Sequence, residues 1–128
     1  MASTEETIAR VIAGGRVAYG AACMVAPGIA AGPAGARAEG QLRWMVRAFG
    51  VRDVILGAGT LRALRDDPTS AVGWVEMSAA ADGLDLANAV VFHKELDRTG
   101  VIGVFALAVP ATLGGWWAAQ KLRASAGS

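Results

Sequence analysis

The strongest constraint on this chain is one uncharged segment, residues 101–120, which lies between Arg98 and Lys121. A helix rises about 1.5 Å per residue, so a segment of this length extends about 30 Å, the thickness of the hydrocarbon core of a bilayer. The segment therefore predicts a membrane-spanning helix.

Composition points in the same direction. The 128 residues are 54% hydrophobic and only 18% charged, whereas about 25% of a typical soluble domain is charged. The mean hydropathy is +0.41. Because the excess of apolar side chains must be buried and lipid is the simplest place for it, we expect a single integral membrane domain over residues 1–128.

A second apolar segment covers residues 8–31 and contains Arg10 and Arg16. A cleaved signal peptide is the alternative, because Ala36 and Ala38 flank Arg37 in an A-x-A pattern. The region before the apolar segment carries Glu5 and Glu6, where a signal peptide would carry positive charge. We therefore expect an uncleaved first span.

Two further spans are expected at residues 44–64 and 71–92, although both contain charged residues. Each is long enough to cross a bilayer, neither contains Pro, and Gly, Pro and Asp residues mark turns on both sides. All four Trp residues lie near the ends of expected spans, as Trp does at membrane interfaces. The predicted fold is therefore an all-α, four-transmembrane-helix bundle with short loops.

Small residues recur at helical spacing in these spans. Membrane helices associate through such residues because lipid offers no hydrophobic drive toward association. The expected helix-packing positions are Gly14, Ala18, Ala22 and Ala26 in the first span, Gly50 and Gly57 in the second, and Ala111 and Gly115 in the fourth. Pro27 and Pro110 are expected to kink their spans.

Five charged residues lie deep in the expected spans and form the candidate site: Arg16, Arg52, Asp53, Asp82 and Asp85. Charged side chains in membrane-spanning helices usually face the interior of the helix bundle and pair with one another. Asp82 and Asp85 share a helix face with Ser78, so both arginines are expected to point toward this face. Three interpretations stay open: interhelical ion pairs, an unmatched acid that handles a proton or cation, or a polar pocket for a lipid headgroup or partner helix.

The sequence contains no motif of an enzyme, metal centre or cofactor site, so no catalytic residue and no cofactor is expected. Cys23 is the single cysteine and lies in an apolar segment, which favours a packing role. The net charge of +1 is spread along the chain, and nucleic acid is not an expected partner.

The segment at residues 47–57 reads RAFGVRDVILG, and Trp74 and the pair Asp82 and Asp85 follow it. In these features the chain resembles a family of small, uncharacterised bacterial integral membrane proteins of actinobacterial type. The resemblance implies a four-helix membrane fold without implying an activity. It also implies that Arg52, Asp53, Asp82 and Asp85 are the characteristic polar residues.

The expected function is that of a non-enzymatic accessory subunit in a larger membrane complex, such as a transport or lipid-handling assembly. Its expected partners are other integral membrane subunits and membrane lipids, and its expected location is the cell inner membrane, crossed several times. The alternative is a small proton- or cation-coupled transporter that uses the buried acidic residues.

Overall fold

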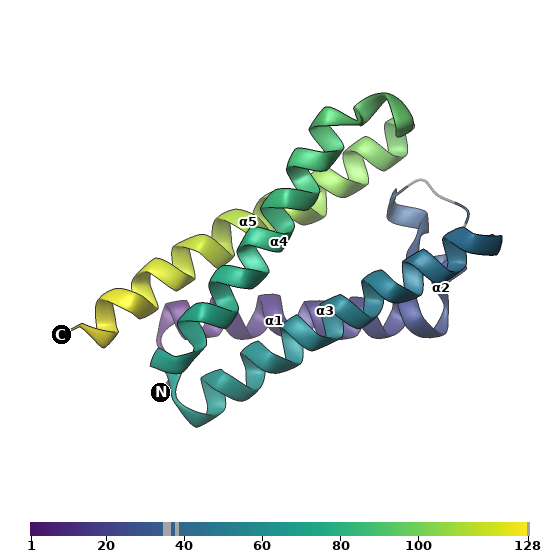
Figure 1. Ribbon diagram of the computed structural model, residues 1–128. Helices are drawn as coiled ribbons and strands as arrows, with labels where there is room; N and C mark the ends of the chain where they lie inside the picture. The colour runs from purple at the N-terminus through teal and green to yellow at the C-terminus, as the bar shows by residue number, and fades with distance from the viewer. Residues whose placement is uncertain (35–36, 38, 128) are drawn as a thin grey trace.

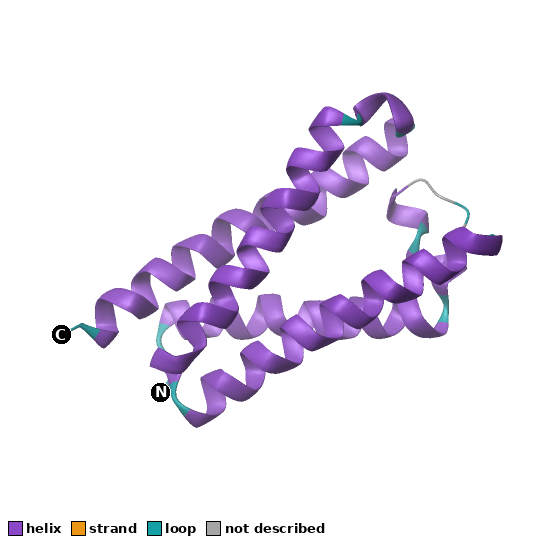
Figure 2. Ribbon diagram, viewed as in Figure 1, coloured by secondary structure: helices purple, strands orange, loops and turns teal. Residues whose placement is uncertain are grey.

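The computed structural model describes residues 1–34, 37 and 39–127, and every regular element in this part of the chain is helical (Figure 2). Ala36 and Ala38 of the A-x-A pattern lie outside the described residues. The elements are α1 (Thr4–Val25), α2 (Pro27–Ala30), η1 (Gly32–Ala34), α3 (Gly40–Asp66), η2 (Pro68–Ala71), α4 (Val72–Val91), η3 (His93–Glu95) and α5 (Arg98–Ala126). The prediction of an all-α fold is confirmed.

The first expected span is divided by a proline. α1 begins after Ser3, whose side chain accepts a hydrogen bond from the Glu6 amide, and it ends at Val25. Pro27 lacks an amide hydrogen and its ring crowds the preceding turn, so the helix stops and Pro27 becomes the first residue of α2. The expected single helix over residues 8–31 is therefore two helices. Pro110, by contrast, lies inside the continuous α5.

The other helix boundaries follow local turn chemistry. Between α3 and α4, the Thr69 amide and hydroxyl donate to the Asp67 carboxylate at 3.0 and 2.6 Å. These hydrogen bonds lower the pKa of Asp67. At the start of α5, the Asp97 carboxylate accepts a hydrogen bond of 2.6 Å from the Gly100 amide and caps the helix. Short turns of this kind bring successive helices back alongside one another.

The helices pack as two pairs, α1 with α3 and α4 with α5, and α1 also contacts α5. The pairs approach each other at the end that carries both chain termini and separate toward the other end (Figure 1). The hydrophobic core lies where they approach, and it consists of Ala9, Leu64, Ala71, Val75, Ala118, Ala119 and Leu122. The two pairs therefore diverge from the end with the termini, and η1 packs against the first part of α5 at the other end.

Large apolar side chains lie mainly on the outside of this fold. Val11, Leu84 and Leu113 are 69%, 71% and 66% exposed, whereas the largest fully buried side chains are Leu64 and Cys23. Among the described residues, two helices, α1 and α5, are long and apolar enough to cross a membrane. α3 and α4 also have the length, with 27 and 20 residues, but not the composition.

Glycines allow α1 and α3 to touch at the level of the backbone. A Cβ atom on Gly57 would lie 2.5 Å from the Ala13 carbonyl oxygen, and one on Gly50 would lie 2.5 Å from the Gly20 carbonyl oxygen. A Cβ on Gly20 would in turn lie 2.6 Å from the Gly50 carbonyl oxygen. The structure thus places Gly50 and Gly57 in a helix contact, as their small size predicts.

The expected packing face of α1 is corrected by the structure. Ala18 and Ala22 are exposed, and Ala26 lies in the break before α2. Among the described residues, no other segment comes within 4 Å of a Cβ built on Gly14. The residues of α1 that pack inward are instead Ala9, Ala13, Arg16, Gly20 and Cys23. On α5, Gly115 packs against Ala79 of α4, and Ala111 is half-buried nearby. Ala18 and Ala22 therefore point away from the other described helices, and Gly14 lies half-buried on the same face.

Candidate functional site

Arg16 lies at the centre of the candidate site and joins three helices. Its side chain is 6% exposed and donates to the Asp53 carboxylate of α3 at 2.6 Å. The same guanidinium forms an ion pair with Asp82 of α4 and donates to the Ser78 carbonyl oxygen at 2.9 Å. A guanidinium carries five N–H donors in a planar fork, which allows one side chain to serve several acceptors. Arg16 thus ties α1 to both α3 and α4.

Arg52 forms the second half of the site, nearer the surface. Its Nη2 atom lies 2.6 Å from the Asp85 carboxylate of α4 and 3.6 Å from that of Asp53. The guanidinium stacks 4.4 Å above the centre of the Phe49 ring, and the Phe49 ring meets the Tyr19 ring edge-on. The aromatic face stabilises the cation and fixes its position. Arg52 therefore provides a second link between α3 and α4.

The expected juxtaposition of the five charged residues is present. Both arginines meet the face of α4 that carries Ser78, Asp82 and Asp85, although Arg16 bonds to the carbonyl of Ser78 and not to its hydroxyl. Sequence reasoning missed Phe49 and Tyr19. The available signal was spacing, because Phe49 precedes Arg52 by three residues and Tyr19 follows Arg16 by three, which places each beside its arginine on a helix.

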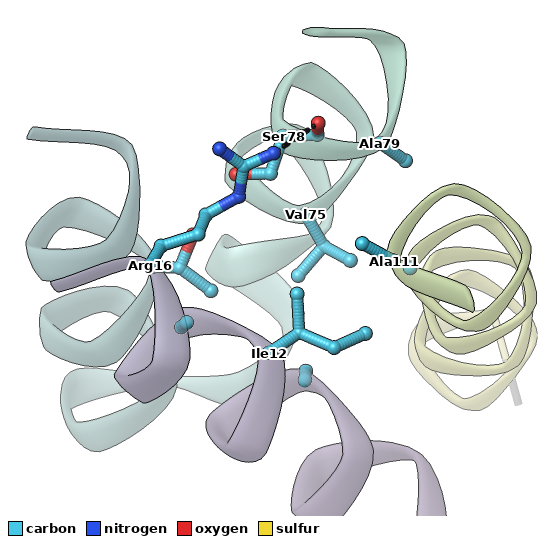
Figure 3. A pocket seen from close by; sticks show the side chains of 10 residues that line it. Ile12, Arg16, Val75, Ser78, Ala79 and Ala111 are labelled. Atoms are coloured by element: carbon cyan, nitrogen blue, oxygen red, sulfur yellow. Dashed lines mark hydrogen bonds between the residues drawn. The ribbon is translucent and has the colours of Figure 1, made fainter. Parts of the chain in front are cut away.

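Several buried polar atoms in this region have no hydrogen-bond partner among the described residues: Arg16 Nε, Arg52 Nε, Ser78 Oγ, Asp82 Oδ2 and Thr112 Oγ1. A cavity of about 10 Å³ adjoins two of these residues, Arg16 and Ser78, and is otherwise lined by Thr60 and small or apolar residues. Figure 3 shows Arg16 reaching across this cavity to Ser78, with Ile12, Val75 and Ala111 on the other sides. The space fits about one water molecule, the kind of group that satisfies such atoms.

The chemistry available at the site is that of ion pairing and proton exchange. Three carboxylates face two guanidinium groups, so the fully ionised cluster has a formal charge of −1, which is +2 from Arg16 and Arg52 minus 3 from Asp53, Asp82 and Asp85. Within the described part of the chain, no group of three or more His, Cys, Asp or Glu side chains is placed to hold a metal ion. The site is therefore an arginine–aspartate network that links three helices.

No protein-family model matches this chain, and neither the curated proteins nor the solved structures compared with it give a match. Its resemblance to small bacterial membrane proteins stays a prediction.

Proposed function

We propose that this chain is a four-span integral membrane protein and a non-enzymatic accessory subunit of a larger membrane assembly. The proposed location is the cell inner membrane, and the proposed host is a transport or lipid-handling complex. The partners would be the helices of other integral membrane subunits together with membrane lipids.

The observation that carries the membrane proposal is the reversed distribution of side chains. Ile55 and Leu107 are 57% and 56% exposed, while Arg16 and Asp53 are 6% and 5% exposed. In a water-soluble protein large apolar side chains are usually buried, and charged side chains are rarely buried. In a bilayer this distribution is favourable, since lipid solvates the apolar side chains and the charges pair inside.

α3 and α4 can also cross a bilayer, although their charged residues make their composition less typical of a membrane span than that of α1 and α5. Their lengths of 27 and 20 residues correspond to about 40 and 30 Å, enough to cross a bilayer. The deep charges of these helices belong to the arginine–aspartate network, in which Asp53 is buried, Asp82 is largely buried, and the half-exposed Arg52 and Asp85 pair with each other. Such pairing makes four spans compatible with the charges.

The role of accessory subunit is supported by the outward face of α1. Gly14, Ala18 and Ala22 form a smooth surface, on which Ala18 and Ala22 are exposed and a Cβ on the half-buried Gly14 would meet no atom of the described residues within 4 Å. Small residues at four-residue spacing let the backbone of another membrane helix approach closely. We infer that a helix of a partner subunit packs here.

Replacing Ala18 by Leu should separate the chain from its partners without unfolding it. The larger side chain would hold a partner helix away, whereas Ala18 is exposed within the chain itself. The measurement is purification of the tagged full chain from native membranes in mild detergent, with quantification of copurifying membrane proteins. Ala106→Leu is the matched control, because Ala106 is an exposed alanine of α5. A wild-type chain that always runs alone as a small monomer would refute the proposal.

A second candidate, a small proton- or cation-coupled transporter, is favoured by one observation. Asp82 Oδ2 is buried and has no partner among the described residues, while the cluster contains one more acid than base. A buried carboxylate oxygen without a partner is the kind of group that takes up a proton or cation in membrane transporters.

Flux measurements separate the two candidates. The purified full chain in liposomes should carry protons or monovalent cations if it is a transporter, and flux should stop when Asp82 and Asp85 are both replaced by Asn. If the wild-type chain carries no flux, or both forms carry the same flux, the transporter is excluded.

A further inference from the structure

A second hollow of the molecule lies on the outer surface, where α1 meets the first half of α3. This groove has a volume of about 520 Å³ and is lined by Met24, Trp44, Arg47, Ala48 and Val51. The four α3 residues share one helix face, since Arg47, Ala48 and Val51 lie three, four and seven residues after Trp44. The groove is thus apolar apart from one guanidinium.

The position of that guanidinium is set by the end of α1. Arg47 Nε donates to the Met24 carbonyl oxygen at 3.1 Å. Carbonyls in the last turn of a helix lack intrahelical partners, and α1 ends at Val25 because Pro27 follows. Only one of the five N–H donors is used in this bond, and the described residues offer no partner to the other four. Arg47 therefore keeps a forked donor group available beside the groove.

The electrostatic surroundings of the groove favour an anion. The first part of α3, residues 40–51, contains Arg43 and Arg47 and no carboxylate, and residues 19–25 of α1 are uncharged. The first turn of α3 contains no acidic residue, and its N-cap residue Glu39 makes no side-chain cap. Arg47 lies two turns into α3, beyond the first turn where the helix dipole acts, so its own guanidinium supplies the attraction for an anion.

We propose that this groove binds an anionic glycerophospholipid. The phosphate lies on the Arg47 guanidinium, whose planar fork matches phosphate oxygens. An acyl chain lies along Met24, Ala48 and Val51, and the Trp44 ring, 71% exposed, lies at the level of the headgroup. An apolar groove beside a basic group fits a lipid better than free phosphate, which has no apolar part. This inference rests on the proposed membrane location.

The test uses the full chain reconstituted into vesicles of equal parts phosphatidylglycerol and phosphatidylcholine, then extracted with its tightly bound lipid. The ratio of the two bound lipids is measured by mass spectrometry. We expect the wild type to retain mainly phosphatidylglycerol, and Arg47→Gln to lower the ratio about fivefold, the effect of one basic residue near anionic lipid. Arg47→Lys should keep most of the preference, because it keeps the charge.

Arg62→Gln is the matched control, because Arg62 lies near the other end of α3 with its side chain 81% exposed. It should leave the ratio unchanged. A wild type without preference, an equal loss in Arg62→Gln, an Arg47→Lys variant that behaves like Arg47→Gln, or displacement of the lipid by inorganic phosphate would each overturn the inference. A chain that inserts into vesicles without preference refutes this lipid site alone, whereas a chain that stays in solution refutes the membrane location itself.

Discussion

Replacing Arg16 by Met should lower the free energy of unfolding by about 3–5 kcal/mol, the usual cost of removing one member of a buried ion pair. Without the guanidinium, Asp53 keeps Arg52 at 3.6 Å, but Asp82 loses the ion pair it makes in the described structure. The uncompensated charge of Asp82 is then buried between α1, α3 and α4. The measurement is reversible unfolding of the purified chain in mixed micelles, followed by the loss of helical circular dichroism.

Two further variants test the reason for this loss. The triple variant Arg16→Met, Asp53→Asn and Asp82→Asn removes the stranded charges and should recover most of the stability. Arg62→Met removes an exposed arginine that pairs with Asp66 one helical turn away, and it should change stability by less than about 0.5 kcal/mol. If Arg16→Met proves as mild as Arg62→Met, the network does not hold the helices together.

The second large effect is expected from Gly57→Ala, which adds one methyl group where α1 and α3 touch. The new Cβ would lie 2.5 Å from the Ala13 carbonyl oxygen and 2.8 Å from a methyl of Val17. Since a backbone carbonyl cannot rotate away, the helices must separate. We expect a loss of about 1–3 kcal/mol, as for other overpacked sites, measured by the same unfolding experiment.

Gly14→Ala is the matched control, and its effect should have the opposite sign. Both glycines lie inside helices, but a Cβ on Gly14 meets no atom within 4 Å. Ala at such an uncrowded helix position should therefore add about 0.5–1 kcal/mol through its better helix propensity. Equal effects of the two substitutions would contradict the close contact between α1 and α3.

Much of the helical architecture could be predicted from apolar segments and turn residues. The expected spans at 44–64, 71–92 and 101–120 fall inside or within one residue of α3, α4 and α5. The meeting of Arg16 and Arg52 with Asp82 and Asp85 was predictable too, because charges in apolar helices need partners and these acids share a face.

The packing face of α1 could have been predicted and was not. Arg16 is two residues from both Gly14 and Ala18, so on a helix it lies about 200° around the axis from each. The buried charge and the stripe of small residues therefore cannot both face inward. Burial of Arg16 is enforced by its bonds to α3 and α4, and the small residues are left on the outside. The charge was the stronger signal because an unpaired charge in lipid costs more than an unpacked alanine.

Other features depend on how the helices lie relative to one another, which the spacing of residues along each helix does not determine. The groove beside Arg47 exists because α1 stops before Pro27 and leaves the Met24 carbonyl for a residue of α3. The two helix pairs diverge away from the chain termini, and no local pattern specifies the angle between them (Figure 1).

The central claim is that α3 and α4 cross the membrane with their apolar sides toward lipid. The most direct measurement is labelling of single cysteines, in a Cys23→Ala background, by a membrane-impermeant maleimide. Ile55 and Leu84 are 57% and 71% exposed in the chain, yet cysteines there should stay unlabelled until the membrane is dissolved, whereas one at Thr69 in η2 should react from water. Labelling of positions 55 and 84 in intact membranes as fast as position 69 would contradict the account.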